Sequence, residues 1–137
     1  MAETFEIEIV TPDKMVVRDV AEEAQVPAKN GYLGILPGHA PLITELAIGE
    51  ITYRTAGTTT HIAVAWGFAE VLPNKVTILA ESAERAEDID VKRAEAAKQR
   101  AEERLRGGHS DIDFNRALNA LKRAESRLQV AGTLTNQ

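Results

Sequence analysis

Four arginines in the last third of the chain have a spacing that could bind a negatively charged ligand. Arg93 and Arg100 lie seven residues apart, and Arg123 and Arg127 lie four apart, so each pair falls on one helix face. A polyphosphate between two such helices would satisfy their forked donors with charge-assisted hydrogen bonds. Taken alone, however, the arginines favour a simpler arrangement, which is ion pairing with glutamates along solvated helices. The candidate partners are Glu95, Glu102, Glu103 and Glu125.

The sequence offers no catalytic constellation. It contains no cysteine, which excludes thiolate catalysis and disulfides, and its three histidines are scattered. No Gly-x-x-x-x-Gly-Lys-[Ser/Thr] segment is present, so the phosphate cradle of a P-loop ATPase is missing. We therefore expect no metal site, no catalytic cofactor and no ATP hydrolysis by this chain itself.

The composition excludes several classes of partner. A net charge of -5 and a pI of about 5.2 argue against nucleic acid, because the phosphate backbone would be repelled. No run of residues approaches the roughly 20 apolar positions that span a bilayer. The first residues, MAETFEIEIV, have neither the basic start nor the apolar stretch of a signal peptide. We expect a soluble, cytosolic chain.

The first of the two parts that must position the arginines is rich in β-strands. Apolar Phe5, Ile7 and Ile9 alternate with polar residues, as in a half-buried strand. Turn signals such as Pro12-Asp13 and Pro73-Asn74 separate further short strands. These strands are expected at residues 15–20, 25–27, 34–36, 49–55, 60–66, 67–72 and 75–80. Short strands at this spacing predict an antiparallel β-sandwich or a flattened barrel.

The second part is helical. Asp88-Ile89-Asp90 offers an N-cap before Val91, and Gly107-Gly108 should end the first helix. Asp111 and Asp113 can cap a second helix, and the short turn between the helices predicts an antiparallel hairpin. The first helix presents mainly alanines, which bury little apolar area, so the hairpin should be only marginally stable. The chain is therefore α+β, with a sandwich in residues 1–83 and a helical hairpin in residues 84–137.

The two parts differ in charge. Residues 1–83 hold five Lys/Arg against eleven Asp/Glu, a net charge of -6, whereas residues 84–137 hold eleven against ten. In the second helix Arg116, Lys122, Arg123 and Arg127 face only Glu125. That helix could dock on an acidic surface, or it could simply present a solvated face.

Two segments resemble the epsilon subunits of bacterial F-type ATP synthases. They are GYLGILPGHAPL at residues 31–42 and IDVKRA at residues 89–94, and the match extends through GFAEV at 67–71 and VTILA at 76–80. The resemblance implies a sandwich of about ten strands followed by two C-terminal helices. It also implies a non-catalytic central-stalk (rotor) subunit that couples proton flow to ATP synthesis.

The resemblance further implies which partners the chain contacts. The sandwich would pack on the gamma subunit and on the ring of c subunits, at the cytoplasmic face of the bacterial membrane, and would be attached to the membrane only through the complex. The turn formed by Lys29, Asn30, Gly31 and Tyr32 would face the ring, and His39 would lie near gamma. The alternative for His39 is a turn histidine that hydrogen-bonds locally.

A subset of these subunits binds ATP through an [Ile/Leu]-Asp-x-x-Arg-Ala motif, which residues 89–94 match at every position. By resemblance, ATP is a regulatory ligand here, with or without magnesium. The residues implied are Glu84, Ile89, Asp90 and Ala94 around the nucleoside, and Arg93, Arg100, Arg123 and Arg127 around the phosphates.

We expect ATP to hold the hairpin folded and its loss to let the helices extend along gamma and inhibit hydrolysis. In the extended state Arg116 and Lys122 would help to meet an acidic segment of a catalytic beta subunit. Two alternatives remain. One is a coupling subunit whose hairpin never inhibits, and the other is a free-standing nucleotide sensor outside any rotary motor.

Overall fold

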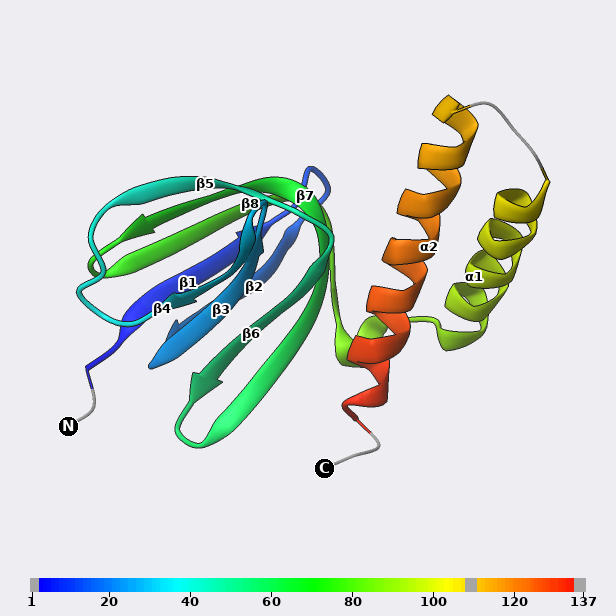
Figure 1. Cartoon of the computed structure of the whole chain (residues 1–137). Coiled ribbons are helices and arrows are strands. Elements are labelled where there is room, and N and C mark those ends of the chain that lie inside the picture. Colours follow the sequence, from blue (N-terminus) through cyan, green and yellow to red (C-terminus); the bar gives the residue numbers. More distant parts are fainter. Residues whose placement is uncertain (1–2, 108–110, 135–137) are drawn as a thin grey trace.

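Eight strands and two long helices make up the part of the chain that the computed structural model describes, residues 3–107 and 111–134 (Figure 1). The strands are β1 (Phe5–Val10), β2 (Met15–Ala21), β3 (Glu23–Ala28), β4 (Gly31–Ile35), β5 (Leu42–Leu46), β6 (Gly49–Thr55), β7 (Thr58–Leu72) and β8 (Lys75–Arg85). A 3₁₀ turn, η1 (Ala86–Asp88), leads into α1 (Val91–Arg106) and α2 (Asp111–Gly132). The predicted β-sandwich followed by a helical hairpin is therefore confirmed.

The sandwich is built from one sheet that folds over on itself. Its strands run in the order β2-β1-β8-β7-β5-β3-β4, and β6 pairs with both β3 and β7. The long strand β7 connects the layers, because residues 58–64 pair with β6 and residues 67–71 pair with β5. Most pairs are antiparallel as expected, but β1 and β8 run parallel, with Ile7 opposite Val76. The sheet is therefore mixed.

The strand prediction was wrong in two places. Residues 60–66 and 67–72 form the single strand β7, so the described sandwich has eight strands rather than about ten. The strand bends instead of ending, with φ angles of 57° at Trp66 and 125° at Gly67. The prediction also missed β5, because the exposed side chains of Leu42 and Ile43 break the alternation of apolar and polar residues.

The interior of the sandwich is filled by branched aliphatic side chains from both layers. The largest of those that are fully buried include Ile7, Ile9, Ile51, Ile62 and Ile78. β-Branched residues suit this position because their restricted rotamers pack well on a pleated surface.

The one buried tyrosine of the sandwich core keeps its polar group satisfied. The hydroxyl of Tyr53 donates a hydrogen bond to Asp19 at 2.9 Å, and burial raises the pKa of that hydroxyl. The hydroxyl therefore stays protonated, and the core carries no unpaired charge at this point.

The first helix begins where the sequence predicted. Asp90 is the N-cap of α1, and its carboxylate accepts a hydrogen bond from the backbone N–H of Arg93 at 3.1 Å. Gly107 caps the other end, donating its N–H to the carbonyl of Arg104. Gly108 and the side chain of Asp111, which were also predicted to lie at helix ends, fall outside the described residues.

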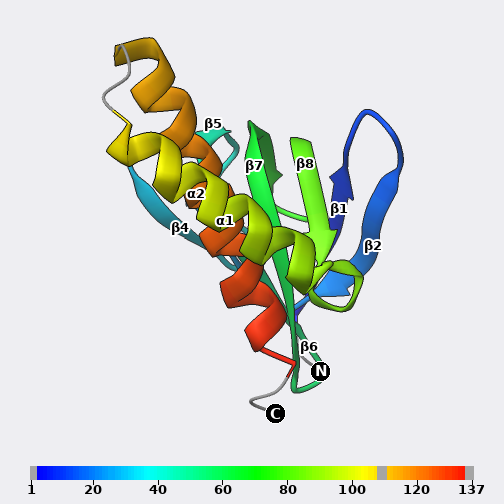
Figure 2. The ribbon, with the colours of Figure 1, turned by 90° about the vertical axis from the view of Figure 1, so that its right-hand side faces the viewer.

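The two helices meet along a seam of small side chains. Ala94 and Ala101 of α1 and Ala117 and Ala124 of α2 are all buried, and each pair is seven residues apart. Figures 1 and 2 show α2 lying between α1 and the sandwich. A second apolar cluster joins the end of α2 to the sandwich and consists of Ala63, Ala86, Ile89, Val130 and Ala131. The hairpin thus rests on short side chains at both of its interfaces.

Replacing Gly67 with alanine should destabilise the sandwich severely. A Cβ at this position would lie 2.0 Å from the carbonyl oxygen of Leu79, in addition to the unfavourable positive φ of 125°. We expect the free energy of unfolding to fall by about 3 kcal/mol or more, measured by urea denaturation.

Gly57→Ala is the matched control, since Gly57 has a positive φ of 82° but nothing within 4 Å of an added Cβ. It should lose only about 1–2 kcal/mol. Equal losses at the two positions would contradict the close contact between β7 and β8.

Candidate anion-binding site

A cavity of about 700 Å³ lies where the two helices face the edge of the sandwich. Its walls come from α1, α2, the end of β8 and the turn between β1 and β2. The volume falls within the range of about 300–1,000 Å³ that is usual for small-molecule sites. Seven of the eight residues that the sequence predicted for a nucleotide line this cavity, and they are Glu84, Asp90, Arg93, Ala94, Arg100, Arg123 and Arg127.

The eighth predicted residue occupies a different position. Ile89 is 8% exposed and packs in the apolar cluster with Val130 rather than in the cavity wall. It precedes Asp90 directly and so helps to anchor the start of α1 against the end of α2. Its contribution to the cavity is therefore indirect, through the placement of the capped helix start.

Three of the four predicted arginines, and Arg104 beside them, have no carboxylate partner in the part of the chain that the structure describes. Among the described residues, Arg93, Arg100 and Arg123 form no ion pair with any acidic side chain. Of the glutamates that were the candidate partners, Glu102 pairs with Arg106 at 3.8 Å instead. The alternative of ordinary ion pairs along each helix therefore does not hold for these three arginines within the described part of the chain.

The fourth arginine of the predicted set connects the hairpin to the sandwich. Arg127 Nε donates to Glu84 Oε1 at 2.6 Å, which joins α2 to β8. Both side chains are about one third exposed, so solvent screens the pair and limits its contribution to roughly 1 kcal/mol or less. The contact positions the Arg127 guanidinium in the wall more than it stabilises the fold.

The charge of the wall is positive although the whole chain is acidic. Seven basic residues and five acidic ones line the cavity. The basic residues are Lys14, Arg85, Arg93, Arg100, Arg104, Arg123 and Arg127, and the acidic ones are Asp13, Glu81, Glu84, Asp88 and Asp90. The net charge of +2, together with the four guanidinium groups that have no ion pair within the described residues, suits an anion with several oxygens.

Sequence reasoning missed several residues of the wall. Arg104 follows Arg100 by four residues and so lies on the same face of α1, a signal that was available in the sequence. Thr11, Asp13 and Lys14 come from the β1–β2 turn, far from the helices in sequence. No local pattern could have indicated them, because only the pairing of β1 with β8 brings that turn beside the hairpin.

The predicted partner-contact residues lie on the surface, away from this cavity. Lys29 and Asn30 are exposed at the β3–β4 turn, where Lys29 pairs with Glu45 at 3.3 Å. Gly31 follows with a φ of 129°, and Tyr32 is 61% exposed. His39 Nδ1 hydrogen-bonds to the adjacent carbonyl of Ala40 at 2.7 Å, so this histidine does make the local contact given as the alternative to a partner role.

The basic residues of α2 divide between two surfaces. Arg116 and Lys122 are exposed, whereas Arg123 and Arg127 are partly buried and line the cavity. In the folded hairpin the four positive charges therefore do not form one continuous face. A partner could meet all four only after the hairpin opens.

An apolar face on the outside of the sandwich is unpaired in the described chain. Ile43 of β5, Phe68 of β7 and Leu79 of β8 are 69%, 52% and 56% exposed. Phe68 and Leu79 are direct partners in the ladder between β7 and β8, so their side chains share one face. Exposed apolar residues gathered in this way are typical of a docking surface.

No group of three or more potential metal-ligating side chains occurs within residues 3–107 and 111–134. None of the described helices is long and apolar enough to cross a membrane.

Comparison with known proteins matches nearly the whole chain to one family. Residues 4–86 match the model of the ATP synthase delta/epsilon chain β-sandwich domain, and residues 87–132 match that of its long α-helix domain. The ATP synthase epsilon chain of Koribacter versatilis is 74% identical over 105 residues, which is 77% of this chain and 74% of that one. The epsilon chain of Solibacter usitatus is 52% identical over 102 residues, covering 74% of this chain and 76% of its own.

Solved structures show the same fold at low sequence identity. A chain of the Euglena gracilis mitochondrial ATP synthase superposes with a TM-score of 0.80 at 21% identity, covering 93% of this chain and 81% of that one. A chain of the Tetrahymena thermophila mitochondrial ATP synthase gives 0.56 at 17% identity, with 97% of both chains covered. The chain therefore belongs to the delta/epsilon-chain family of F-type ATP synthases, as an epsilon chain, which is a non-catalytic stalk subunit and not an enzyme.

Proposed function

We propose that this subunit regulates its ATP synthase by binding ATP between the hairpin and the sandwich, so that ATP holds the hairpin folded. The observation that carries the proposal is that Arg93, Arg100 and Arg123 line one cavity and form no ion pair with any acidic side chain that the structure describes. These groups come from both helices, so an anion bound to all of them bridges α1 and α2. Bound ATP would therefore act as a clasp.

Carboxylates of the same cavity suit the adenine and the ribose of ATP. Glu84 and Asp90 lie at the side where β8 leads into α1, and both can accept hydrogen bonds from an amino group or a ribose hydroxyl. The Asp90 carboxylate is already fixed by its capping contact with the Arg93 N–H. A ligand with a neutral, donor-bearing base and a charged tail matches this division better than a simple anion does.

The hairpin is suited to switching because little apolar surface holds it. Its seam consists of Ala94, Ala101, Ala117 and Ala124, each of which contributes far less buried area than a leucine. A ligand at a hundred times its dissociation constant stabilises the state it binds by about 2.7 kcal/mol. That amount is comparable to a few of the contacts that dock the hairpin, so ATP can decide between the folded and the open state.

Gamma and the c ring are the proposed partners of the sandwich. The apolar face at Ile43, Phe68 and Leu79 offers a surface for gamma, with His39 nearby in the β4–β5 connection, and the turn at residues 29–32 is exposed for the ring. The related Euglena and Tetrahymena chains come from assemblies described as F1 with the c ring and as central stalk with the c ring. The subunit would therefore sit at the cytoplasmic face of the bacterial membrane, bound only through the complex.

Opening of the hairpin would inhibit ATP hydrolysis because it lets basic residues of α2 bind an acidic segment of a catalytic beta subunit. Arg123 and Arg127 line the cavity in the folded state and would become accessible beside Arg116 and Lys122 in the open state. The open helix would then expose all four basic residues to an acidic segment of a catalytic beta subunit. The same two arginines cannot serve ATP and beta at once, which makes the two states mutually exclusive.

Calorimetric titration of the isolated subunit with ATP should give saturable one-to-one binding that depends on the unpaired arginines. Arg100→Gln and Arg123→Gln should each weaken the affinity about tenfold or more, because each removes charge-assisted hydrogen bonds to phosphate. The melting temperature of the ligand-free variants should not fall, since neither arginine has a carboxylate partner to lose.

Arg106→Gln is the control, because Arg106 is 73% exposed, pairs with Glu102 and lies outside the cavity. The Arg106→Gln variant should bind ATP with the same affinity as the unmodified chain. The absence of binding at millimolar ATP, or equal loss in all three variants, would contradict the proposed clasp.

Ending the chain at residue 86 should raise ATP hydrolysis by the assembled enzyme severalfold at low ATP and change it little at high ATP. The charge-reversed variant with Arg116→Glu and Lys122→Glu should also relieve inhibition, because it opposes the basic face that meets beta. It should leave the ATP affinity of the subunit unchanged, since neither residue lines the cavity. Equal hydrolysis with and without the hairpin would instead favour a coupling subunit without a regulatory role.

A further inference from the structure

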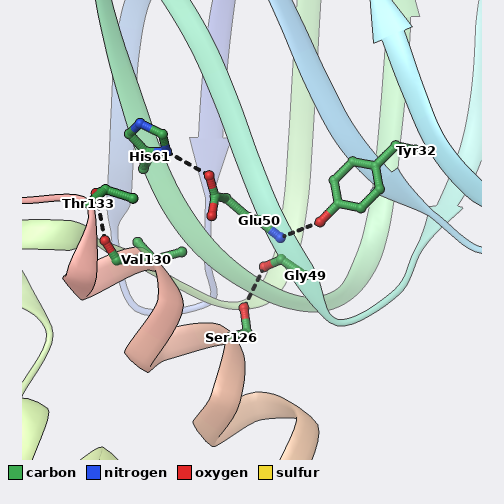
Figure 3. A network of polar contacts seen from close by, with 7 residues as sticks. All are labelled: Tyr32, Gly49, Glu50, His61, Ser126, Val130 and Thr133. Carbon is green, nitrogen blue, oxygen red and sulfur yellow. Dashed lines mark hydrogen bonds and ion pairs between the residues drawn. The ribbon is translucent and has the colours of Figure 1, made fainter. Parts of the chain in front are cut away.

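One peptide group at the start of β6 is held from both sides by side chains of other elements (Figure 3). The carbonyl of Gly49 accepts a hydrogen bond from Ser126 Oγ of α2 at 2.8 Å. The N–H of Glu50, which belongs to the same peptide group, donates to the hydroxyl of Tyr32 at 3.1 Å. This single peptide group therefore contacts both Tyr32, beside the exposed turn at residues 29–31, and Ser126 of the docked helix α2.

The packing around the peptide leaves it little freedom. A Cβ added to Gly49 would lie 2.7 Å from the Cβ of Pro27 and 2.9 Å from the hydroxyl oxygen of Tyr32. Only glycine allows this approach, so the tyrosine hydroxyl sits against a fixed surface. The side chain of Glu50 is fixed as well, because its carboxylate lies 2.6 Å from His61 Nδ1 of β7 (Figure 3).

Tyr32 connects the peptide to the exposed turn at residues 29–31. It is the second residue of β4, and it pairs with Pro27 directly beside that turn. Most of the side chain is exposed, so the hydrogen bond from Glu50 is its principal anchor on the sandwich. A displacement of the turn therefore moves the tyrosine hydroxyl relative to the Gly49–Glu50 peptide.

Ser126 connects the same peptide to the docking of the hairpin. The next residue is Arg127, whose ion pair with Glu84 joins α2 to β8, and one helical turn further Val130 enters the apolar cluster. The three contacts follow one another along α2. Loss of the serine contact removes one of the few polar attachments that hold α2 to the sandwich.

We infer that Tyr32, the Gly49–Glu50 peptide and Ser126 form a latch that couples the turn at residues 29–32 to the docking of the helical hairpin. With the Tyr32 hydroxyl in place, the peptide is held and polarised, and its carbonyl is a better acceptor for Ser126. With the hydroxyl displaced, the peptide can shift and α2 undocks more often. The coupling stands on the contacts alone, whereas its use as a regulatory signal rests on the proposed function.

A double-mutant cycle on the full chain tests the latch, with amide hydrogen exchange in α2 as the measure of undocking. Tyr32→Phe and Ser126→Ala each remove one hydrogen bond and should each raise exchange in α2 about three- to tenfold. The double variant should exchange more slowly than the product of the two single effects, because both bonds act through one peptide. Exchange in β1 and β8, which are interior strands of the sheet, should stay unchanged.

Tyr53→Phe is the matched control, since it also removes a tyrosine hydroxyl from a hydrogen bond, but the partner of that hydroxyl is Asp19 of β2 and not a group of α2. It should not accelerate exchange selectively in α2. The latch is contradicted if Tyr32→Phe leaves α2 unchanged, if the two single effects multiply fully in the double variant, or if Tyr53→Phe acts as Tyr32→Phe does.

Titration of the same variants with ATP separates this inference from the proposed clasp. Coupled exchange without any ATP binding would support the latch and contradict the clasp. ATP binding with no effect of Tyr32→Phe on α2 exchange would support the clasp and contradict the latch.

Discussion

The seam of alanines between α1 and α2 is the constraint on which the rest of the structure depends. Ala94 and Ala101 face Ala117 and Ala124, and their small side chains let the helices approach closely enough for arginines of both to line one cavity. The same small side chains bury little apolar area, so the seam alone cannot hold the hairpin. The same small side chains thus account both for the candidate anion-binding site and for the marginal stability on which the proposed effect of ATP depends.

The sandwich is held firmly by its core, whereas the hairpin is attached to it only weakly. Large β-branched residues fill the sandwich core, and the long strand β7 connects its layers. Within the described residues, the contacts that attach the hairpin include the Arg127–Glu84 ion pair, a hydrogen bond from Ser126 to a backbone carbonyl and a cluster that contains Ala63 and Val130. Local opening of the weakly attached element, with the sandwich intact, is what this distribution of contacts favours. A subunit that switches in the proposed way, and that stays bound to its partners while it does so, needs this division.

Much of the fold could be predicted because it rests on local patterns. Period-two alternation marked most strands, and the Asp90 cap and the glycine at 107 set the limits of α1. The failures have local causes too, since exposed Leu42 and Ile43 obscured β5, and the bend at Trp66–Gly67 looked like a strand end. The arginines could be found from spacing and motif. The β1–β2 turn in the cavity wall and the contact of Tyr32 with Glu50 could not, because both depend on strands that are distant in sequence.

The most direct test of the clasp is the position of α1 in the assembled enzyme as ATP is varied. The chain has no cysteine, so Gln25→Cys and Gln99→Cys on exposed parts of β3 and α1 would place two spin labels uniquely. Pulsed electron resonance should show the folded-hairpin separation at saturating ATP, a longer one after ATP removal, and only the longer one with Arg123→Gln at intermediate ATP. A separation that does not respond to ATP in the unmodified subunit would contradict the account.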